Sequence, residues 1–246
     1  MKLKKVNFSL LKRTSLLIFF FIFFHIFNLS LVYCENNDAK LLEQYYLDGV
    51  YYYVDKSYSS AYEQFEGLSK NYPYSNYTEK SIIMEAYTNY LDKEYVKIPG
   101  IYEVYNKLYP DGKYMAYMLY LKCMSYYSLI KSANNGIHNI NEGAIVFEEL
   151  LQKYPESEFA KASEEKLNYV IKLQQLSDLK IADFLYKNEN YIAAMRKYTS
   201  LFNTYKENLN FEIKKVALAQ IINLSKMLHL EENVVKYQNL LNKIEK

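Results

Sequence analysis

The sequence of 246 residues has no tryptophan, two cysteines, three histidines, four prolines and six glycines. Two cysteines, Cys34 and Cys123, are too few for a disulfide framework, and the surroundings of Cys123 indicate a small buried hydrophobic residue in a helix. Neither His138 nor His229 has a second metal-ligand residue at helical spacing. The glycines form no phosphate-binding loop. The sequence therefore predicts no metal, no cofactor and no enzyme activity.

The chain also lacks a strong excess of positive charge. Residues 1–33 carry five basic residues and no acidic one, so the rest of the chain holds 25 basic against 28 acidic residues, a net charge of −3. Nucleic-acid binding normally needs a positive field. We therefore expect no nucleic-acid partner.

Tyrosine, by contrast, is abundant, with 29 residues. A tyrosine side chain fills space like other aromatics and keeps a hydroxyl that needs water or a partner. A surface rich in tyrosine is suited to binding extended peptides.

The N-terminus has the order of a secretory signal. A basic stretch, MKLKKVNFSLLKRTS, precedes an apolar run from Leu16 to Phe27 that only His25 interrupts. This run is shorter than the roughly 20 apolar residues of a comfortable membrane-spanning helix. Extending it to Val32 leaves a retained membrane helix as an alternative.

The run ends in Leu31-Val32-Tyr33-Cys34, which resembles the cleavage site of a bacterial lipoprotein signal. Leu31 and Cys34 fit that pattern, whereas Tyr33 stands where the pattern has Gly, Ala or Ser. The resemblance implies cleavage before Cys34 and attachment of lipid to it. Ordinary cleavage without lipid stays an alternative.

The remaining chain repeats one spacing pattern, in which a small residue is followed by a second small residue, a large aromatic and a helix stop. In the first repeat these are Gly49, Ala61, Phe65 and Pro73. The second repeat carries Ala86, Ile98, Tyr102 and Pro110, with isoleucine in the second small position. The third carries Gly143, Phe147 and Pro155 from the second small position onward, and the fourth carries Ala182, Ala194, Tyr198 and Lys206, where lysine replaces proline. A fifth unit, from Phe211 to the end, is apolar at helical spacing.

This spacing is typical of paired helices. The small residues let the two helices of a hairpin approach, the aromatic packs between neighbouring hairpins, and Tyr-Pro ends the second helix because the residue before proline avoids the α region. The pattern resembles the tetratricopeptide repeat. It predicts an all-α, right-handed solenoid of about five tetratricopeptide-like helical hairpins.

Two stretches depart from the pattern. The third repeat is longer, and KSANNGIHNINEG, residues 131–143, predicts a loop between its helices. After Pro155 no Gly or Pro occurs for over 30 residues, which predicts a helix to about Lys187, with a break near Ser177 as an alternative.

A lipoprotein-like signal followed by about five such hairpins resembles the BamD family of outer-membrane β-barrel assembly lipoproteins. The best-matching stretches are YPYSNYTEKSIIMEAYTNYL (72–91), GAIVFEELLQKYPESEFAKASEEKLNYV (143–170) and IADFLYKNENYIAAMRKYTSLFNTY (181–205). The resemblance implies a signal peptide at 1–33, an N-terminal half at 34–157 and a C-terminal half at 158–246. It implies a lipid-anchored protein on the inner leaflet of the bacterial outer membrane, facing the periplasm.

The resemblance also implies two partners: the periplasmic domains of the large barrel component, and unfolded precursors of outer-membrane proteins with an aromatic end. For the precursor, the first helices of the first two repeats predict a groove lined by Tyr46, Val50, Tyr53, Lys80, Ile83, Tyr87 and Tyr90, some of which could instead be packing residues. For the barrel component we expect docking at Tyr186, Asn190, Arg196, Tyr205 and Lys206.

Two other classes stay open. One is a periplasmic tetratricopeptide scaffold that coordinates cell-envelope or cell-division factors. The other is a secreted eukaryotic repeat protein, for which Asn76-Tyr77-Thr78 would be a glycosylation site.

Overall fold

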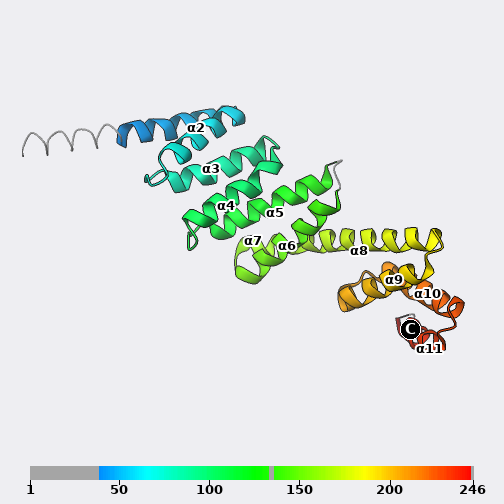
Figure 1. The fold of residues 1–246 in the computed structure, drawn as a ribbon. Helices are drawn as coiled ribbons and strands as arrows, with labels where there is room; N and C mark the ends of the chain where they lie inside the picture. The colour runs from blue at the N-terminus through cyan, green and yellow to red at the C-terminus, as the bar shows by residue number, and fades with distance from the viewer. Residues whose placement is uncertain (1–38, 133–135, 245–246) are drawn as a thin grey trace, which may run out of the picture. The chain divides into compact units, whose positions relative to one another are not determined.

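A computed structural model describes residues 39–132 and 136–244, and all regular structure in these ranges is helical (Figure 1). The prediction of an all-α protein built from tetratricopeptide-like hairpins is therefore confirmed. The chain divides into two compact units, one ending at Thr88 and one beginning at Asn89. The predicted boundary between residues 157 and 158 lies inside the second unit, and the division into functional halves stays a prediction.

The first unit contains a helix over residues 39–54, α2 (Tyr58–Asn71) and most of α3 (Thr78–Leu91). Ala61 and Phe65 are fully buried on α2. A Cβ atom added to Gly49 would lie 2.7 Å from Cε1 of Phe65. The phenyl ring thus rests directly on the glycine backbone, which confirms the predicted close approach of these two helices.

The second unit is a series of helices in which α5 packs against α6, α8 against α9 and α10 against α11. Successive hairpins also pack on each other, α6 against α8 and α9 against α10. The elements are η1 (Tyr95–Lys97), α4 (Ile98–Leu108), α5 (Met115–Lys131), α6 (Ile137–Lys153), α7 (Glu158–Lys161), α8 (Glu164–Lys187), α9 (Tyr191–Tyr205), η2 (Lys206–Asn208), α10 (Phe211–Met227) and α11 (Glu231–Ile244).

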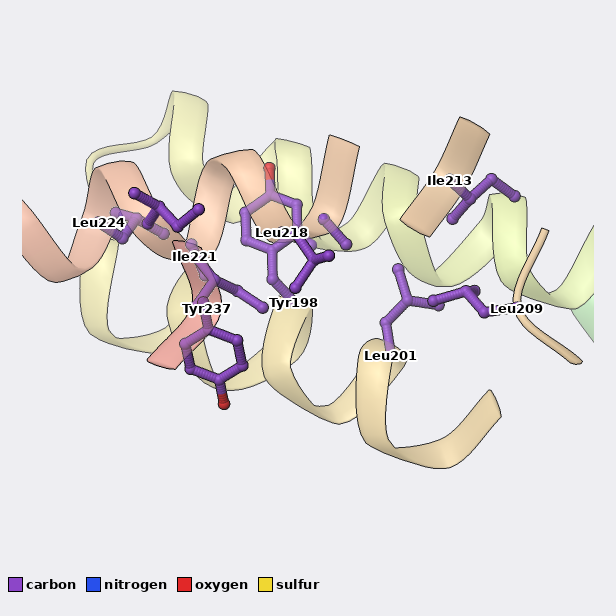
Figure 2. Packing of buried hydrophobic residues seen from close by; sticks show 12 residues of the cluster. Tyr198, Leu201, Leu209, Ile213, Leu218, Ile221, Leu224 and Tyr237 are labelled. Atoms are coloured by element: carbon purple, nitrogen blue, oxygen red, sulfur yellow. The ribbon is translucent and has the colours of Figure 1, made fainter. Parts of the chain in front are cut away.

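The last two hairpins share one hydrophobic core, centred on Tyr198 of α9 (Figure 2). Tyr198 is fully buried, and its hydroxyl donates a hydrogen bond to Asp183. Burial of the ring and the neighbouring Asp183 carboxylate both raise the pKa of this phenol. The aromatic predicted from the repeat spacing is therefore a core residue, flanked by the fully buried small residues Ala182 and Ala194.

Three helices end at a Tyr-Pro pair, as the sequence predicts. Tyr72, Tyr109 and Tyr154 have φ of −133°, −133° and −132°, with ψ of 62°, 61° and 52°, so each lies outside the α region. Each still donates its backbone N–H to the carbonyl four residues earlier. In the fourth hairpin, α9 ends instead at Lys206, which has a φ of 31°.

Four hairpin turns share a helix-capping motif that the sequence analysis does not predict. In the first, the Ser57 N–H donates to the Tyr52 carbonyl at 2.9 Å and the Lys56 N–H to the Tyr53 carbonyl at 3.1 Å. This pair of bonds, around one left-handed residue, is a Schellman motif, which usually has glycine in that place. The left-handed residues here are Lys56, Lys93, Glu189 and His229, with φ of 64°, 64°, 60° and 56°.

The loop predicted at residues 131–143 is wrong for most of its length, because α6 already begins at Ile137. Ile140, Ala144 and Phe147 are buried at helical spacing, and this burial outweighs the poor helix propensity of the Asn and Gly residues. A Cβ atom at Gly143 would lie 3.2 Å from Cδ1 of Ile130. The glycine is thus a close-approach point inside a helix.

The helix predicted to run to about Lys187 does end there, as α8. The alternative break near Ser177 is not found, because α8 is continuous from Glu164. The interruption lies earlier, after the short α7, at the buried Ser163. The Ser163 hydroxyl donates to the Phe159 carbonyl at 2.7 Å, which ties the turn to the preceding helix.

Candidate partner-binding surfaces

The predicted groove residues of the first unit lie on two helices. Tyr46, Val50 and Tyr53 follow one face of the first helix and are half-buried. On α3, Lys80 is exposed, whereas Ile83 and Tyr87 are half-buried. Tyr90 belongs to the second unit, where its ring lies 5.4 Å from that of Tyr95.

The structure brings only part of this set together. The rings of Tyr53 and Tyr87 lie 6.0 Å apart, and Tyr58 lies 6.3 Å from Tyr53. Tyr46 lies against Phe65, at 5.7 Å, and Tyr77, at 5.3 Å. Such distances are typical of packed aromatic pairs.

Two aromatic clusters therefore take the place of one continuous trough. Tyr46 is one of the tyrosines that serve in packing, because its ring contacts the buried Phe65. Sequence reasoning missed Tyr58 and Tyr77 because both stand at helix starts, outside the spacing used to select groove positions. The role of the groove set in binding a peptide stays a prediction.

The predicted docking residues do not form one cluster. Tyr186 and Asn190 lie at the α8–α9 turn, whereas Tyr205 and Lys206 lie at the opposite end of α9. The 15 residues of α9 span about 22 Å. Arg196 lies between these ends and is exposed.

Two of these residues have structural partners. The Tyr186 hydroxyl accepts a hydrogen bond from Asn223 Nδ2 at 3.2 Å, and its ring packs on Tyr191 at 5.7 Å. The Tyr205 hydroxyl lies 3.4 Å from Asp178 Oδ2. Burial, followed by the Asp178 carboxylate, raises the pKa of Tyr205 to about 12. Both tyrosines therefore hold helices together.

Arg196 borders an apolar hollow of about 520 Å³ that sequence reasoning missed. The hollow lies between α9 and the turn from α10 to α11. The sequence feature that could have indicated this hollow is the pair of leucines in MLHL, residues 227–230. Turns exposed to solvent are usually polar, so apolar residues there suggest a contact surface. The lining residues are Ile192, Met195, Arg196, Thr199, Ser200, Leu228 and Leu230.

An open apolar hollow with a guanidinium at its edge can hold an apolar side chain whose neighbour is acidic. Ile192 and Leu230 are 59% and 40% exposed, so part of the hollow faces solvent. Of the predicted docking set, Arg196 is the residue that lies at such a feature.

Cys34 lies outside the described residues, so its predicted lipid attachment stays a prediction. Cys123 is fully buried, and its thiol donates to the Val146 carbonyl at 3.4 Å. Burial raises the pKa of this thiol, which makes it unreactive.

Across residues 39–132 and 136–244, the structure holds no cluster of three metal-ligating side chains. Over the same part of the chain, no helix is both long enough and apolar enough to span a membrane.

The comparisons with known proteins agree on one family. The model described as YfiO, outer membrane lipoprotein, matches residues 38–240. The chain is 26% identical over 207 residues to the outer membrane protein assembly factor BamD of Rickettsia prowazekii, covering 84% of this chain and 81% of that protein.

Two further relatives carry the same name. The protein from Caulobacter vibrioides is 23% identical over 149 residues, which cover 61% of this chain and 49% of that protein. The protein from Neisseria gonorrhoeae is 21% identical over 201 residues, which cover 76% of this chain and 75% of that protein. At these identities, individual binding residues have to be tested in this chain itself.

Proposed function

Because the chain belongs to the YfiO family of outer membrane lipoproteins, we propose that it is a non-catalytic assembly factor for outer-membrane β-barrel proteins. The observation that carries this proposal is the family match over residues 38–240, together with relatives named as assembly factors. Association with the outer membrane follows from the family. The helical hairpins supply surfaces for partners, as in other repeat proteins.

The proposed tether is lipid on Cys34. Burying an acyl chain contributes about 0.8 kcal/mol per methylene, and stable anchoring needs more than one chain. A lipoprotein-type cysteine carries several. The net charge of −3 after residue 33 gives no general attraction to anionic lipid, so the acyl chains are the main attachment to the inner leaflet.

Replacing Cys34 by serine is expected to abolish lipid attachment, leaving the signal uncut or releasing a soluble form if another peptidase acts. The mass of the N-terminal peptide decides between these forms, and Cys123→Ser, which leaves Cys34 in place, is the matched control. An unmodified start near Glu35 in the parent protein would contradict the lipid tether. An intact Met1 would show that Tyr33 prevents processing.

The proposed docking site for the periplasmic domains of the barrel component is the exposed side of α9, with Arg196 and the adjacent hollow at its centre. Arg196, Lys206 and Asn190 are the exposed members of the predicted set. Arginine at the edge of an apolar hollow is suited to an interface, because it packs its stem and pairs its guanidinium with a carboxylate. Precursor binding is assigned to the first unit.

Reversing both charges, with Arg196→Glu and Lys206→Glu, is expected to weaken binding of the barrel component by about tenfold or more. The measurement is co-purification of the tagged variant with that component. The matched control is Lys180→Glu with Lys187→Glu, which makes the same change in net charge on exposed positions of α8. Equal losses in both double variants would remove the docking assignment.

The same co-purification tests the proposed function as a whole. An assembly factor is recovered with a large outer-membrane barrel protein. A scaffold for cell-envelope or cell-division factors, the alternative function, is recovered without it. The second outcome would replace the proposed function.

A further inference from the structure

The first helix, residues 39–54, has an apolar stripe on its solvent side. Leu47, Tyr51 and Val54 are 50%, 68% and 71% exposed. Their spacing of four and then three residues places them in one line along a helix. The opposite side of the same helix is already used in packing, because Gly49 is buried there against Phe65. The stripe is therefore not part of the core of the first unit.

The stripe continues toward the N-terminus with polar residues. Lys40, Glu43 and Gln44 fall on or beside the same line of the helix and are exposed. Gln44 donates a hydrogen bond to Asp48 Oδ1 at 2.7 Å, which holds this carboxylate to one side of the stripe. Apolar residues, a tyrosine and a lysine along one line are typical of helices that lie in a membrane interface.

The position of this helix in the chain points to its partner. Four residues, Glu35 to Asp38, separate Cys34 from Ala39, where the described helix begins. Even when fully extended, this segment spans at most about 18 Å, whereas the 16 residues of the helix span about 24 Å. Lipid on Cys34 would thus hold the start of the helix within about 18 Å of the bilayer surface, which lets the helix lie down on that surface.

We infer that the stripe formed by Leu47, Tyr51 and Val54 rests on the phospholipid surface that holds the acyl chains of Cys34, with the first helix lying along the membrane. This inference rests on the proposed lipid tether. A lipid surface fits better than a second copy or a protein partner, because the tether holds the bilayer within reach of the stripe at high effective concentration. Tyr51 can bury its ring at the headgroup level and keep its hydroxyl in water.

The absence of tryptophan from the sequence gives a direct test. In the protein purified from membranes, Tyr51→Trp introduces a single tryptophan into the stripe. The probe is a vesicle of phosphatidylethanolamine and phosphatidylglycerol that contains lipids brominated in the upper acyl chain. We expect a blue shift of the tryptophan emission and a loss of about half of its intensity, as for a side chain that enters the headgroup and acyl boundary.

The matched control is Tyr74→Trp, because Tyr74 is 92% exposed and outside the stripe. Its emission should not respond to the brominated lipid. Adding Leu47→Ser and Val54→Ser to the Tyr51→Trp protein should abolish quenching while the anchor still holds the protein on the vesicle. An anchored Tyr51→Trp protein whose emission is not quenched would overturn the inference. A blue shift without vesicles that depends on protein concentration would assign the stripe to a second copy.

Failure of the tether and failure of the stripe give different results. If the N-terminal mass shows no lipid on Cys34, the tether of the proposed function has failed. The stripe is then tested on protein produced without residues 1–33, whose N-terminal Cys34 thiol is coupled to a maleimide lipid. Cys123 does not compete for this reagent because it is fully buried. Absence of quenching in that coupled protein overturns the inference independently of processing.

Discussion

Replacing Phe65 by alanine is expected to lower the free energy of unfolding by about 3–5 kcal/mol, as for other fully buried aromatic residues. The ring is 0% exposed and lies against the backbone at Gly49 and the ring of Tyr46. The first helix can approach this space only by shifting as a whole against the other helices of the unit, so most of the cavity should persist. Urea unfolding, followed by helicity, measures the loss.

The control for this substitution is Tyr74→Ala, which removes an aromatic that is 92% exposed and should change stability by less than about 0.5 kcal/mol. A second arm uses Gly49→Ala. With Phe65 present, the added Cβ would lie 2.7 Å from the ring and should destabilise the fold. In the Phe65→Ala background, the same methyl group enters the cavity. Alanine also has a higher helix propensity than glycine, so the substitution should cost less there. An equal cost of Gly49→Ala in both backgrounds would show that the ring does not rest on the glycine.

A buried glutamate gives the second large effect. Glu85 of α3 is 8% exposed and accepts a hydrogen bond from the Ser69 hydroxyl at 3.2 Å. Burial, and then the charge of Glu66, raise the pKa of Glu85 to about 7, while Ser69 and Lys70 oppose this shift. Glu66 itself is bound to Lys70 at 2.8 Å and to the Tyr62 hydroxyl.

A carboxyl whose pKa is higher in the folded protein than in the unfolded chain binds its proton more tightly when folded. Its contribution to stability is fully present below the ordinary value of 4.5 and is lost as the pH rises to about 7. At about 1.4 kcal/mol per pKa unit, the loss is of the order of 3 kcal/mol. Glu85→Gln should remove this pH-dependent loss. The free energy of unfolding of the variant relative to that of the parent should therefore increase between pH 5 and pH 8.

The measurement is the free energy of unfolding of both proteins in urea at a series of pH values. The difference between Glu85→Gln and the parent should grow from pH 4.5 to 7 and then stay constant. Glu63→Gln, at an exposed position on α2, supplies the control for a carboxylate outside the buried site. A difference that is the same at pH 5 and pH 8 would show that Glu85 is solvated.

Spacing in the sequence was sufficient to predict the core of the hairpins. Phe65, Phe147 and Tyr198 all follow a small residue at the same interval, and all three are fully buried. The Tyr-Pro stops were equally predictable, because proline restricts the residue before it whatever the tertiary context. These features depend on neighbours within one hairpin, which a short sequence window contains.

The candidate surfaces were less predictable, because they depend on contacts between distant segments. Tyr46 and Tyr53 have similar positions on one helix, but the first packs on Phe65 and the second on Tyr87. The hollow at Arg196 needs two leucines from a turn more than 30 residues later. The start of α6 was missed because local Asn and Gly propensity conflicts with burial of Ile140, which only the folded chain reveals.

The four left-handed turns fix the rotational phase between paired helices. Each closes with the same two hydrogen bonds, although the central residue is Lys, Glu or His. One extra residue at the end of the first helix, before Lys56, would rotate the face from which the chain enters the turn by about 100° and carry Phe65 away from Gly49. The length of these turns, rather than their side chains, therefore determines which helix faces meet. In alignments with relatives of 21–26% identity, insertions and deletions should fall outside these four turns.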